Sequence, residues 1–468
     1  MRTTHQITNS LSAFVSHTDP SSLPPSVVAA SCRSIVDSIA VTLAGVDEPS
    51  ARIALAVLGI AGTEGVATIV GRPERATPLD AAFANGTAAH ALDFDDTHSN
   101  VRGHPSAPVL AAALAAAESV GASGRQLLSA QAIGVEIAGK LGQSLGVSHA
   151  LQGFHSTSVL GTMGATAAVC HLLGLDEERT AMAFGIAGSL AGGLRSNFGT
   201  MTKPLHVGNA ARSGLLAALL AKEGLTSTPN MFDDPSSFSQ VYSPGGDGDS
   251  RAITALGEPW EIVDPGLAVK QYPCCNRASR VAEAIMRIVT EHHPEPEQVA
   301  SVEVHLTENE VDEDGRIGPM IYPEPTTGLE GKFSMQYVVA AAVLDGALGI
   351  GTFADDQVAR PQITSFLRKI RVVADPGRRL DDAASNYHKV VVRLLDGTEQ
   401  AEIVFFARGD PRGERQPSWD DLETKFSDCA AELLNPDEIV RLLEVLTHLD
   451  DLSDIEDLTR ALIPKAGA

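Results

Sequence analysis

The feature that most constrains the fold is a succession of long apolar segments between about Leu23 and Glu223, each bounded by proline, glycine or a capping residue. Proline near a helix start and glycine after a helix end are typical of α-helices. Aromatic residues make up only 4% of the chain, and alanine, glycine and leucine dominate its first half. Such small side chains favour closely packed helices over a β-sandwich. The expected helices span residues 27–44, 109–120, 126–145, 156–173 and 204–222.

Local signals refine these helices. Ser156 or Thr157 can cap the fourth helix, Gly174 can close it, and Asp176 can cap the next one. The glycine-rich run 185–199 is no dinucleotide fingerprint, because it follows a helical pattern and lacks Gly-x-Gly-x-x-Gly spacing. Close helix packing explains this run better.

The pattern changes after about Pro265. Residues 302–306, 370–373, 390–395 and 401–406 are typical of strands, with a hairpin signal at Asp396-Gly397 and one helix, 333–348, among them. Residues 419–462 return to acidic amphipathic helix. We therefore expect a mainly α protein with three segments. These are an N-terminal helical part (1–265), an α+β domain (266–408), and C-terminal helices that rejoin the helical part (409–468).

Charge and cysteine usage narrow the range of partners. The net charge of −24 argues against nucleic acid or an acidic membrane surface, because both need basic patches. It does not exclude an anionic substrate, since charges are screened within about 8 Å at physiological salt. Five scattered cysteines fit a reduced, cytoplasmic protein. The start, Met1 to His5, lacks a signal-peptide pattern, and no apolar run approaches the roughly 20 residues that span a bilayer.

The segment 90–98, HALDFDDTH, gathers three carboxylates and two histidines. If it is helical, Asp93 and Thr97 share a face. Metal binding is one interpretation, but an Asp-Asp-x-x-Asp magnesium motif fails because Ser99 stands where the third acid belongs. Helix capping with solvated acids is the other interpretation, and it suits Asp95 and Asp96 best.

Two histidines precede expected helix starts. His104 lies before a helix whose N-terminal amides attract anions, and His155 lies before the fourth helix. Either could transfer a proton, because the pKa of histidine lies near neutral pH. A hydrogen-bonded loop histidine is the alternative in both cases. No Gly-x-Ser-x-Gly motif is present, which argues against a serine hydrolase.

Two further segments carry cations. Lys203 stands at a helix N-terminus, where the helix dipole disfavours a cation, so its position suggests a bound anion. An exposed surface lysine is the alternative, and for a lone lysine it is the more usual one. Lys270, Arg277 and Arg280 flank the expected domain junction and could hold carboxylates. The adjacent Cys274 and Cys275 could suggest a metal or redox pair, but no second cysteine pair supports zinc, and burial beside a turn explains them better.

Taken together, these motifs resemble the MmgE/PrpD family. The strings are NGTAAHALDFDDTH, GHPSAPVL, GFHSTSVLGTMGATAA, TKPLHVGNAARSGLLAALLA, KQYPCC, KFSMQYVVAAAVLDG and SWDDLETKFSDCA. The family includes 2-methylcitrate dehydratase, cis-aconitate decarboxylase and iminodisuccinate epimerase. The resemblance implies a large all-helical domain, a smaller α+β lid domain and a homodimer. It also implies a site between the domains that needs no metal or organic cofactor.

The resemblance further implies roles for particular residues. His104, His155, Lys203 and Asp93 correspond to catalytic positions, and Thr97, Lys270 and Tyr337 to substrate-binding ones. Arg277 is added to the substrate-binding residues because of its place at the expected domain junction, not because of the resemblance. The histidines would move protons, and the lysines would stabilise negative charge that develops beside a carboxylate. The family's CC-x-x-x-H pattern is broken here, because Ser279 occupies the histidine position.

The expected activity is that of a lyase acting on a small di- or tricarboxylate. Dehydration or hydration of a 2-methylcitrate-like hydroxy acid, by a carbon–oxygen lyase, is the first expectation. Decarboxylation of a cis-aconitate-like acid, epimerisation of an iminodisuccinate-like acid and a non-catalytic binding protein are the alternatives.

Overall fold

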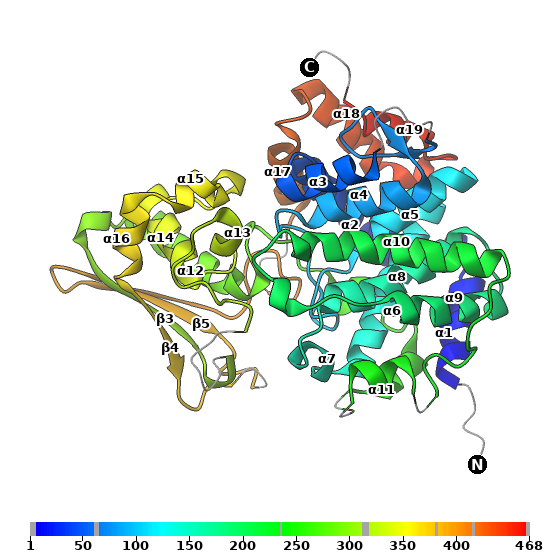
Figure 1. Cartoon of the computed structure of the whole chain (residues 1–468). Coiled ribbons are helices and arrows are strands. Elements are labelled where there is room, and N and C mark those ends of the chain that lie inside the picture. The colour runs from blue at the N-terminus through cyan, green and yellow to red at the C-terminus, as the bar shows by residue number, and fades with distance from the viewer. Residues whose placement is uncertain are drawn as a thin grey trace.

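The computed structural model describes residues 6–59, 65–234, 236–244, 246, 248–310, 318–379, 382–413 and 417–464. Residues 1–5, where a signal-peptide pattern was sought, lie outside this set. Figure 1 shows a helical body and, beside it, a smaller part in which helices cover one face of a sheet.

The helical body contains the predicted long helices, which the structure confirms with small shifts at their ends. Two short strands, β1 (Ala67–Thr68) and β2 (Arg75–Ala76), pair antiparallel at its edge. The helices of this body are α1 (Gln6–His17), α2 (Pro25–Gly45), α3 (Pro49–Leu58), α4 (Pro78–His90), α5 (Ser106–Val120), α6 (Gly124–Leu145), α7 (Ser148–Leu151), α8 (Ser156–Leu172), α9 (Glu177–Leu190), α10 (Thr202–Lys222) and α11 (Phe238–Tyr242).

The capping predictions have mixed outcomes. Asp176 caps α9 by accepting a hydrogen bond from the Arg179 amide, and Gly174 takes the left-handed conformation after α8. The predicted cap of α8 is wrong. His155 occupies the N-cap position with extended backbone, and Ser156 is already the first helical residue. Hydroxyl side chains are usual N-caps, which is why the sequence favours Ser156 or Thr157. The helix nevertheless begins directly after His155, whose side chain makes no capping hydrogen bond.

Small residues bring α4 and α10 close together, which positions the site. A Cβ atom on Gly208 would lie 2.2 Å from Thr87 Oγ1, and one on Gly86 would lie 3.0 Å from the Gly208 Cα. Only glycine permits this approach. Within the predicted packing run, Gly185 and Gly188 of α9 also touch their neighbours, the side chains of Ser227 and Met231 respectively.

Helix α2 is the one described helix that is long and apolar enough to cross a membrane by length and composition, contrary to the expectation that no such run exists. In the structure 72% of its apolar window is buried. It packs against α4, α6 and the C-terminal helix α17 (Trp419–Ala430). A core helix meets the same criteria, and these contacts explain its composition.

The smaller part is built on a four-stranded sheet with strand order β4-β3-β5-β6. β3 pairs parallel with β4 and antiparallel with β5, and β5 and β6 form the predicted hairpin around Asp396-Gly397. The helix α12 (Asn276–His292) packs on β5 and β6. The strands are β3 (Val299–Thr307), β4 (Ile370–Asp375), β5 (His388–Leu394) and β6 (Glu399–Val404).

The prediction of a single helix among these strands is wrong. Between β3 and β4 the described residues form four α-helices, of which only α14 was predicted. The others span four to seven residues, too few for an apolar period to be visible in sequence. These helices are α13 (Gly328–Gly331), α14 (Met335–Asp345), α15 (Asp355–Val358) and α16 (Pro361–Leu367).

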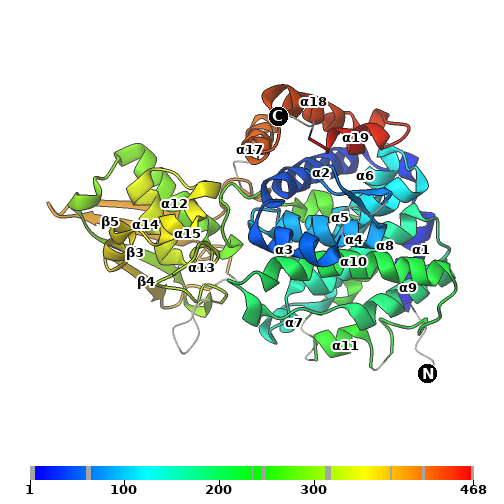
Figure 2. The same cartoon turned by 45° about the horizontal axis from the view of Figure 1, so that its top comes forward.

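Two large hydrophobic cores correspond to the two parts. The first fills the body, and the second lies between the sheet and α12, α14 and α16. The tail helices α17, α18 (Pro436–Thr447) and α19 (Glu456–Ala461) bury Leu422, Phe426 and Leu442 in the first core and lie over the body in Figure 2. The structure thus has a mainly α architecture with a smaller α+β region. The boundaries at 265/266 and 408/409 stay predictions.

Candidate active site

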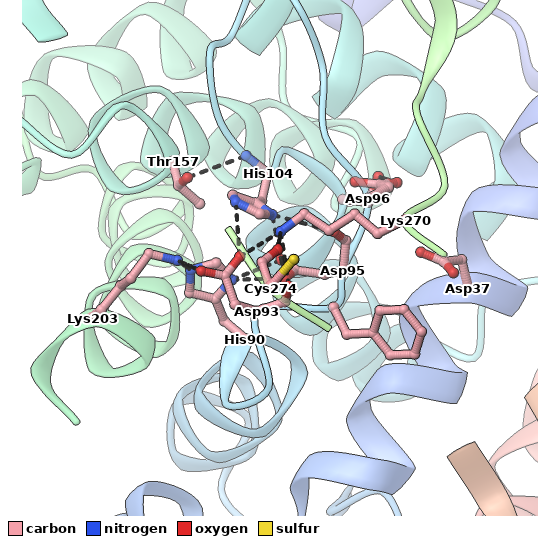
Figure 3. A network of polar contacts seen from close by, with 12 residues as sticks. Asp37, His90, Asp93, Asp95, Asp96, His104, Thr157, Lys203, Lys270 and Cys274 are labelled. Atoms are coloured by element: carbon pink, nitrogen blue, oxygen red, sulfur yellow. Dashed lines mark hydrogen bonds and ion pairs between the residues drawn. The ribbon is translucent and has the colours of Figure 1, made fainter. Parts of the chain in front are cut away.

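Asp93 lies at the centre of the candidate site, in the turn that follows α4. Its φ of 52° is in the left-handed region, which a residue other than glycine seldom adopts. The condition under which Asp93 and Thr97 would share a helix face is not met, because α4 ends at His90 and Thr97 instead pairs with Ala268 in an isolated β-bridge. The turn directs the Asp93 carboxylate between two lysines (Figure 3).

Lys203 is the second residue of α10 and donates to two groups. Its Nζ lies 2.7 Å from Asp93 Oδ2 and 2.6 Å from His90 Nε2. The ammonium group also stands over the rings of Phe198 and Phe333, at 5.2 and 5.5 Å from their centroids. An ammonium group has three donors, so one N–H of Lys203 is left for another acceptor.

Lys270 binds Asp93 from the opposite side. Its Nζ lies 2.5 Å from Asp93 Oδ1, 2.8 Å from the Asp93 carbonyl and 3.0 Å from the Cys274 carbonyl. These three acceptors match its three donors. Burial alone would lower the pKa of Lys270 and raise that of Asp93. Their mutual attraction instead raises the pKa of Lys270, and together with Lys203 it holds the pKa of Asp93 well below its usual range.

A second buried carboxylate, Asp95, joins two histidines. His90 Nδ1 lies 2.8 Å and His104 Nδ1 3.3 Å from Asp95 Oδ1. His90 Nε2 accepts from Lys203, so its Nδ1 carries the proton and the ring is neutral. Burial lowers the pKa of His90 to about 4, which agrees with this assignment. Sequence reasoning placed Asp95 among the structural acids and gave His90 no role, and no spacing in the sequence would have paired them.

His104 presents its other nitrogen to the site. Its Nε2 lies 3.6 Å from Asp93 Oδ1, and its backbone amide donates to Thr157 Oγ1 at 3.1 Å. Because Nδ1 donates to Asp95, Nε2 is the atom that gains or loses a proton. The ring stands edge-on to His90, with centroids 4.6 Å apart.

His155 forms a pair with a histidine that the sequence analysis did not single out. Its Nδ1 lies 3.1 Å from Nδ1 of His206, on the first turns of α10. Burial, followed by the charge of Lys203, holds the pKa of His155 well below its usual range. The His155 ring packs edge-on against Phe198 at 4.8 Å.

Asp93, His104, His155, Lys203 and Lys270 line a cavity of about 400 Å³ at the junction of the helical body and the α+β part. Seven of the eight predicted site residues contribute to its wall, which are Asp93, Thr97, His104, His155, Lys203, Lys270 and Arg277. Ser279, at the position of the missing family histidine, also lines it.

Tyr337 is the exception, and its prediction as a substrate-binding residue is not supported by its position. It is fully buried in α14, outside the cavity wall, where its hydroxyl donates to the Thr352 carbonyl at 2.5 Å. Its ring packs against Phe353. The helix is apolar on every face, so the tyrosine serves the core of the α+β part.

Arg277 enters the cavity from α12 and is tied to a buried acid. Its Nη1 lies 2.9 Å from Glu310 Oε1, and Arg280 reaches the same oxygen at 3.6 Å. His388 Nε2 and the Thr307 hydroxyl also contact Glu310, at 3.0 and 2.8 Å. Burial would raise the pKa of Glu310, but these partners lower it strongly, so this acid remains charged and fixes the arginines.

His90, Asp95 and His104 together could supply ligands to a metal ion, since one atom from each lies within 4.8 Å of the others. Two observations favour a hydrogen-bond network instead. Both Nδ1 atoms already face the Asp95 carboxylate, and the Lys203 ammonium adjoins His90 Nε2. A neighbouring ammonium disfavours a second cation. The cysteine pair is buried, as expected beside a turn, and burial raises the pKa of Cys274 to about 12.

Comparison with known protein families places the chain in one of them. Residues 9–250 match the model of the MmgE/PrpD N-terminal domain, and residues 272–451 match that of the MmgE/PrpD C-terminal domain. The chain belongs to the MmgE/PrpD family. This confirms the resemblance inferred from the motifs.

Several family members with known activities resemble the chain along most of its length. Cis-aconitate decarboxylase of Mus musculus is 32% identical over 97% of this chain and 93% of its own length. The Homo sapiens enzyme of the same name is 31% identical over 97% of this chain and 94% of its own. The 2-methylcitrate dehydratase of Escherichia coli is 25% identical over 79% of this chain and 78% of its own.

Proposed function

We propose that this MmgE/PrpD protein is a lyase that decarboxylates a cis-aconitate-like tricarboxylate. The observation that carries the proposal is the cavity geometry, in which two lysines hold one aspartate and two histidines face the same space. Similarity to the decarboxylases along almost the whole chain favours this reaction over the dehydration that the sequence analysis placed first. Dehydration of a 2-methylcitrate-like acid remains the second candidate, because of the more distant dehydratase relative.

The reaction has a simple electron balance. The bond between a carboxylate and the saturated carbon breaks, and its electron pair forms a new double bond to the central carbon. The electron pair of the original double bond takes up one proton at the other carbon of that bond, the one that is not the central carbon. The cleaved carboxylate leaves as carbon dioxide. Negative charge therefore spreads over the allylic system and the neighbouring carboxylates before protonation is complete.

The site can stabilise that charge and supply that proton. Lys203 donates to Asp93 and His90, which leaves its third N–H for a substrate carboxylate. A preorganised donor of this kind can contribute a factor of about 10²–10³ in rate. His104 holds a proton on Nε2 when it is charged, and Asp95 keeps that ring oriented. Asp93 positions both lysines and does not act as a nucleophile, since both of its oxygens are engaged by ammonium groups.

A proton NMR substrate panel in deuterated buffer tests the proposal. We expect purified protein to convert cis-aconitate into a five-carbon unsaturated dicarboxylate with one incorporated deuteron and equimolar carbon dioxide. Conversion of 2-methylcitrate without carbon dioxide would establish dehydration instead. Deuterium exchange of iminodisuccinate without net conversion would establish epimerisation. The Lys203→Ala protein serves as the matched inactive control.

A further inference from the structure

The proposed substrate carries more carboxylates than the two site lysines can bind. Within the described residues, all three donors of Lys270 already meet protein acceptors, and two donors of Lys203 do so. Of the six N–H donors of the two lysines, only one, on Lys203, is therefore left for a ligand. A tricarboxylate in this cavity needs further cationic donors, and the cavity wall shows where they are.

Most arginines around the cavity are matched by acids. Arg412 makes two bonds to Asp410, of 2.9 and 2.6 Å, and Arg408 pairs with Asp421. Arg280 is held by Asn386 and Glu310. These pairs leave little uncompensated positive charge for a ligand.

Arg195 differs from them. It lies in the connection between α9 and α10, where its backbone amide donates to the Gly153 carbonyl at 2.8 Å and its Nη1 donates to the Ala150 carbonyl at 2.7 Å. Among the residues that the structure describes, no carboxylate contacts its guanidinium group. Burial lowers the pKa of Arg195, and the nearby positive charge of Arg277 lowers it further. An arginine facing a second arginine is unfavourable unless an anion lies between them.

The two arginines belong to opposite sides of the cavity. Arg195 comes from the helical body, and Arg277 comes from α12 of the α+β part. The Arg195 Nη2 atom points toward the facing segment, since a Cβ atom on Gly318 would lie 3.9 Å from it. The side chain of Arg277 is 37% exposed, and its hydrogen bond to Glu310 is made through Nη1.

We propose that Arg195, together with Arg277, forms a carboxylate subsite opposite Lys203 and selects tricarboxylates over dicarboxylates. This inference rests on the proposed function for the identity of the ligand. A planar guanidinium group suits the task because it can bind a carboxylate through two parallel hydrogen bonds. A carboxylate between the two arginines would also tie the α+β part to the body.

Calorimetric binding of non-reacting acids tests the subsite. The probes are propane-1,2,3-tricarboxylate, glutarate, which lacks its central carboxylate, and methylsuccinate, which lacks a terminal one. We expect Arg195→Gln to weaken tricarboxylate binding about 10- to 100-fold, the range of a charged hydrogen bond. At least one of the two dicarboxylates leaves the Arg195 subsite empty. That acid should bind Arg195→Gln with the same affinity as it binds the wild type.

Two further variants make the result decisive. Arg251→Gln removes a surface arginine paired with Asp249, outside the cavity wall, and should bind all three acids as the wild type does. Arg195→Lys keeps the charge without the two-pronged geometry and should give an intermediate loss. If Arg195→Gln fails to fold, the affinities of Arg195→Lys for the tricarboxylate and the two dicarboxylates provide the same test. Unchanged tricarboxylate affinity, or an equal loss for all three acids, would overturn the subsite.

Binding and turnover measured on the wild type and on Arg195→Gln distinguish a failure of this inference from a failure of the proposed reaction. Arg195-dependent tricarboxylate binding without turnover of cis-aconitate would leave the subsite standing and refute the decarboxylation. Turnover of cis-aconitate with a KM that Arg195→Gln does not alter would support the reaction and refute the subsite.

Discussion

His155 and His206 face each other through their Nδ1 atoms at 3.1 Å, so one proton must lie between two nitrogens of the same kind. If His155 holds that proton, its Nε2 is a base. If His206 holds it, His155 Nε2 carries a proton and is an acid. The partner histidine therefore determines which chemistry His155 can perform.

Replacing His206 should consequently affect the chemical step. We expect His206→Asn to lower kcat about 10- to 100-fold, part of the range for general acid–base catalysis, with little change in KM and with an altered pH dependence of kcat. His448→Asn, at an exposed histidine of the tail, is the matched control. A normal kcat–pH profile in His206→Asn would show that His155 does not depend on this contact.

Lys203 should contribute more to the rate than to the fold of its helix. We expect Lys203→Ala to reduce kcat about 10²–10³-fold, because a donor to developing negative charge is lost. Lys222→Ala, at the exposed end of the same helix, should retain full activity. Steady-state kinetics on the substrate identified by NMR provides the measurement. Full activity in Lys203→Ala would refute its assignment.

Acidification should destabilise the protein through its buried neutral histidines. The pKa of His90 is about 4 in the folded protein and about 6.5 when the chain is unfolded, so the unfolded state binds protons more readily. The stability due to neutral His90 is complete above pH 6.5 and is lost as the pH falls toward 4.

Urea denaturation at several pH values measures this effect. One proton bound only on unfolding gives a slope of about 1.4 kcal/mol per pH unit in the free energy of unfolding. We expect His90→Gln to have a shallower slope than the wild type between pH 6.5 and 4. Equal slopes in the two proteins would show that His90 does not titrate in this way.

Lys425 of α17 should stabilise the loop that follows α4 and carries Asp93 and Phe94. Its Nζ lies 2.6 Å from the buried Asp37 and donates to the Phe94 carbonyl at 2.8 Å. Removing one partner of a buried ion pair typically costs 3–5 kcal/mol, and we expect a loss of about that size in Lys425→Met. Adding Asp37→Asn should recover part of it. Urea denaturation of the single and double variants gives the coupling energy, and additive losses would contradict direct pairing.

Chelation should leave activity unchanged, because His90, Asp95 and His104 are engaged in hydrogen bonds beside an ammonium group. The measurement is turnover after dialysis against a chelator, followed by addition of divalent ions. A loss that a divalent ion restores would identify this cluster as a metal site.

The sequence by itself determined the longest helices of the body, the four strands of the larger sheet and the family, because long apolar periods and capping residues act over a few neighbouring positions. It also singled out Asp93, His104, His155, Lys203 and Lys270, since each stands beside a helix end or turn. Tyr337 shows the limit of resemblance alone, because a motif match does not reveal which way a buried side chain points.

Only the tertiary structure decided how these residues work together. Asp93 lies 110 positions from Lys203 and 177 from Lys270, and no local pattern encodes their convergence. The Lys203–Asp93 contact depends on the packing of α4 against α10, and the His90–Asp95–His104 network on that of α4 against α5. The His155–His206 pair depends on the packing of α8 against α10. Within the described residues, the lack of a carboxylate partner for Arg195 is likewise decided by the tertiary structure, because it depends on which residues the two parts bring to the cavity.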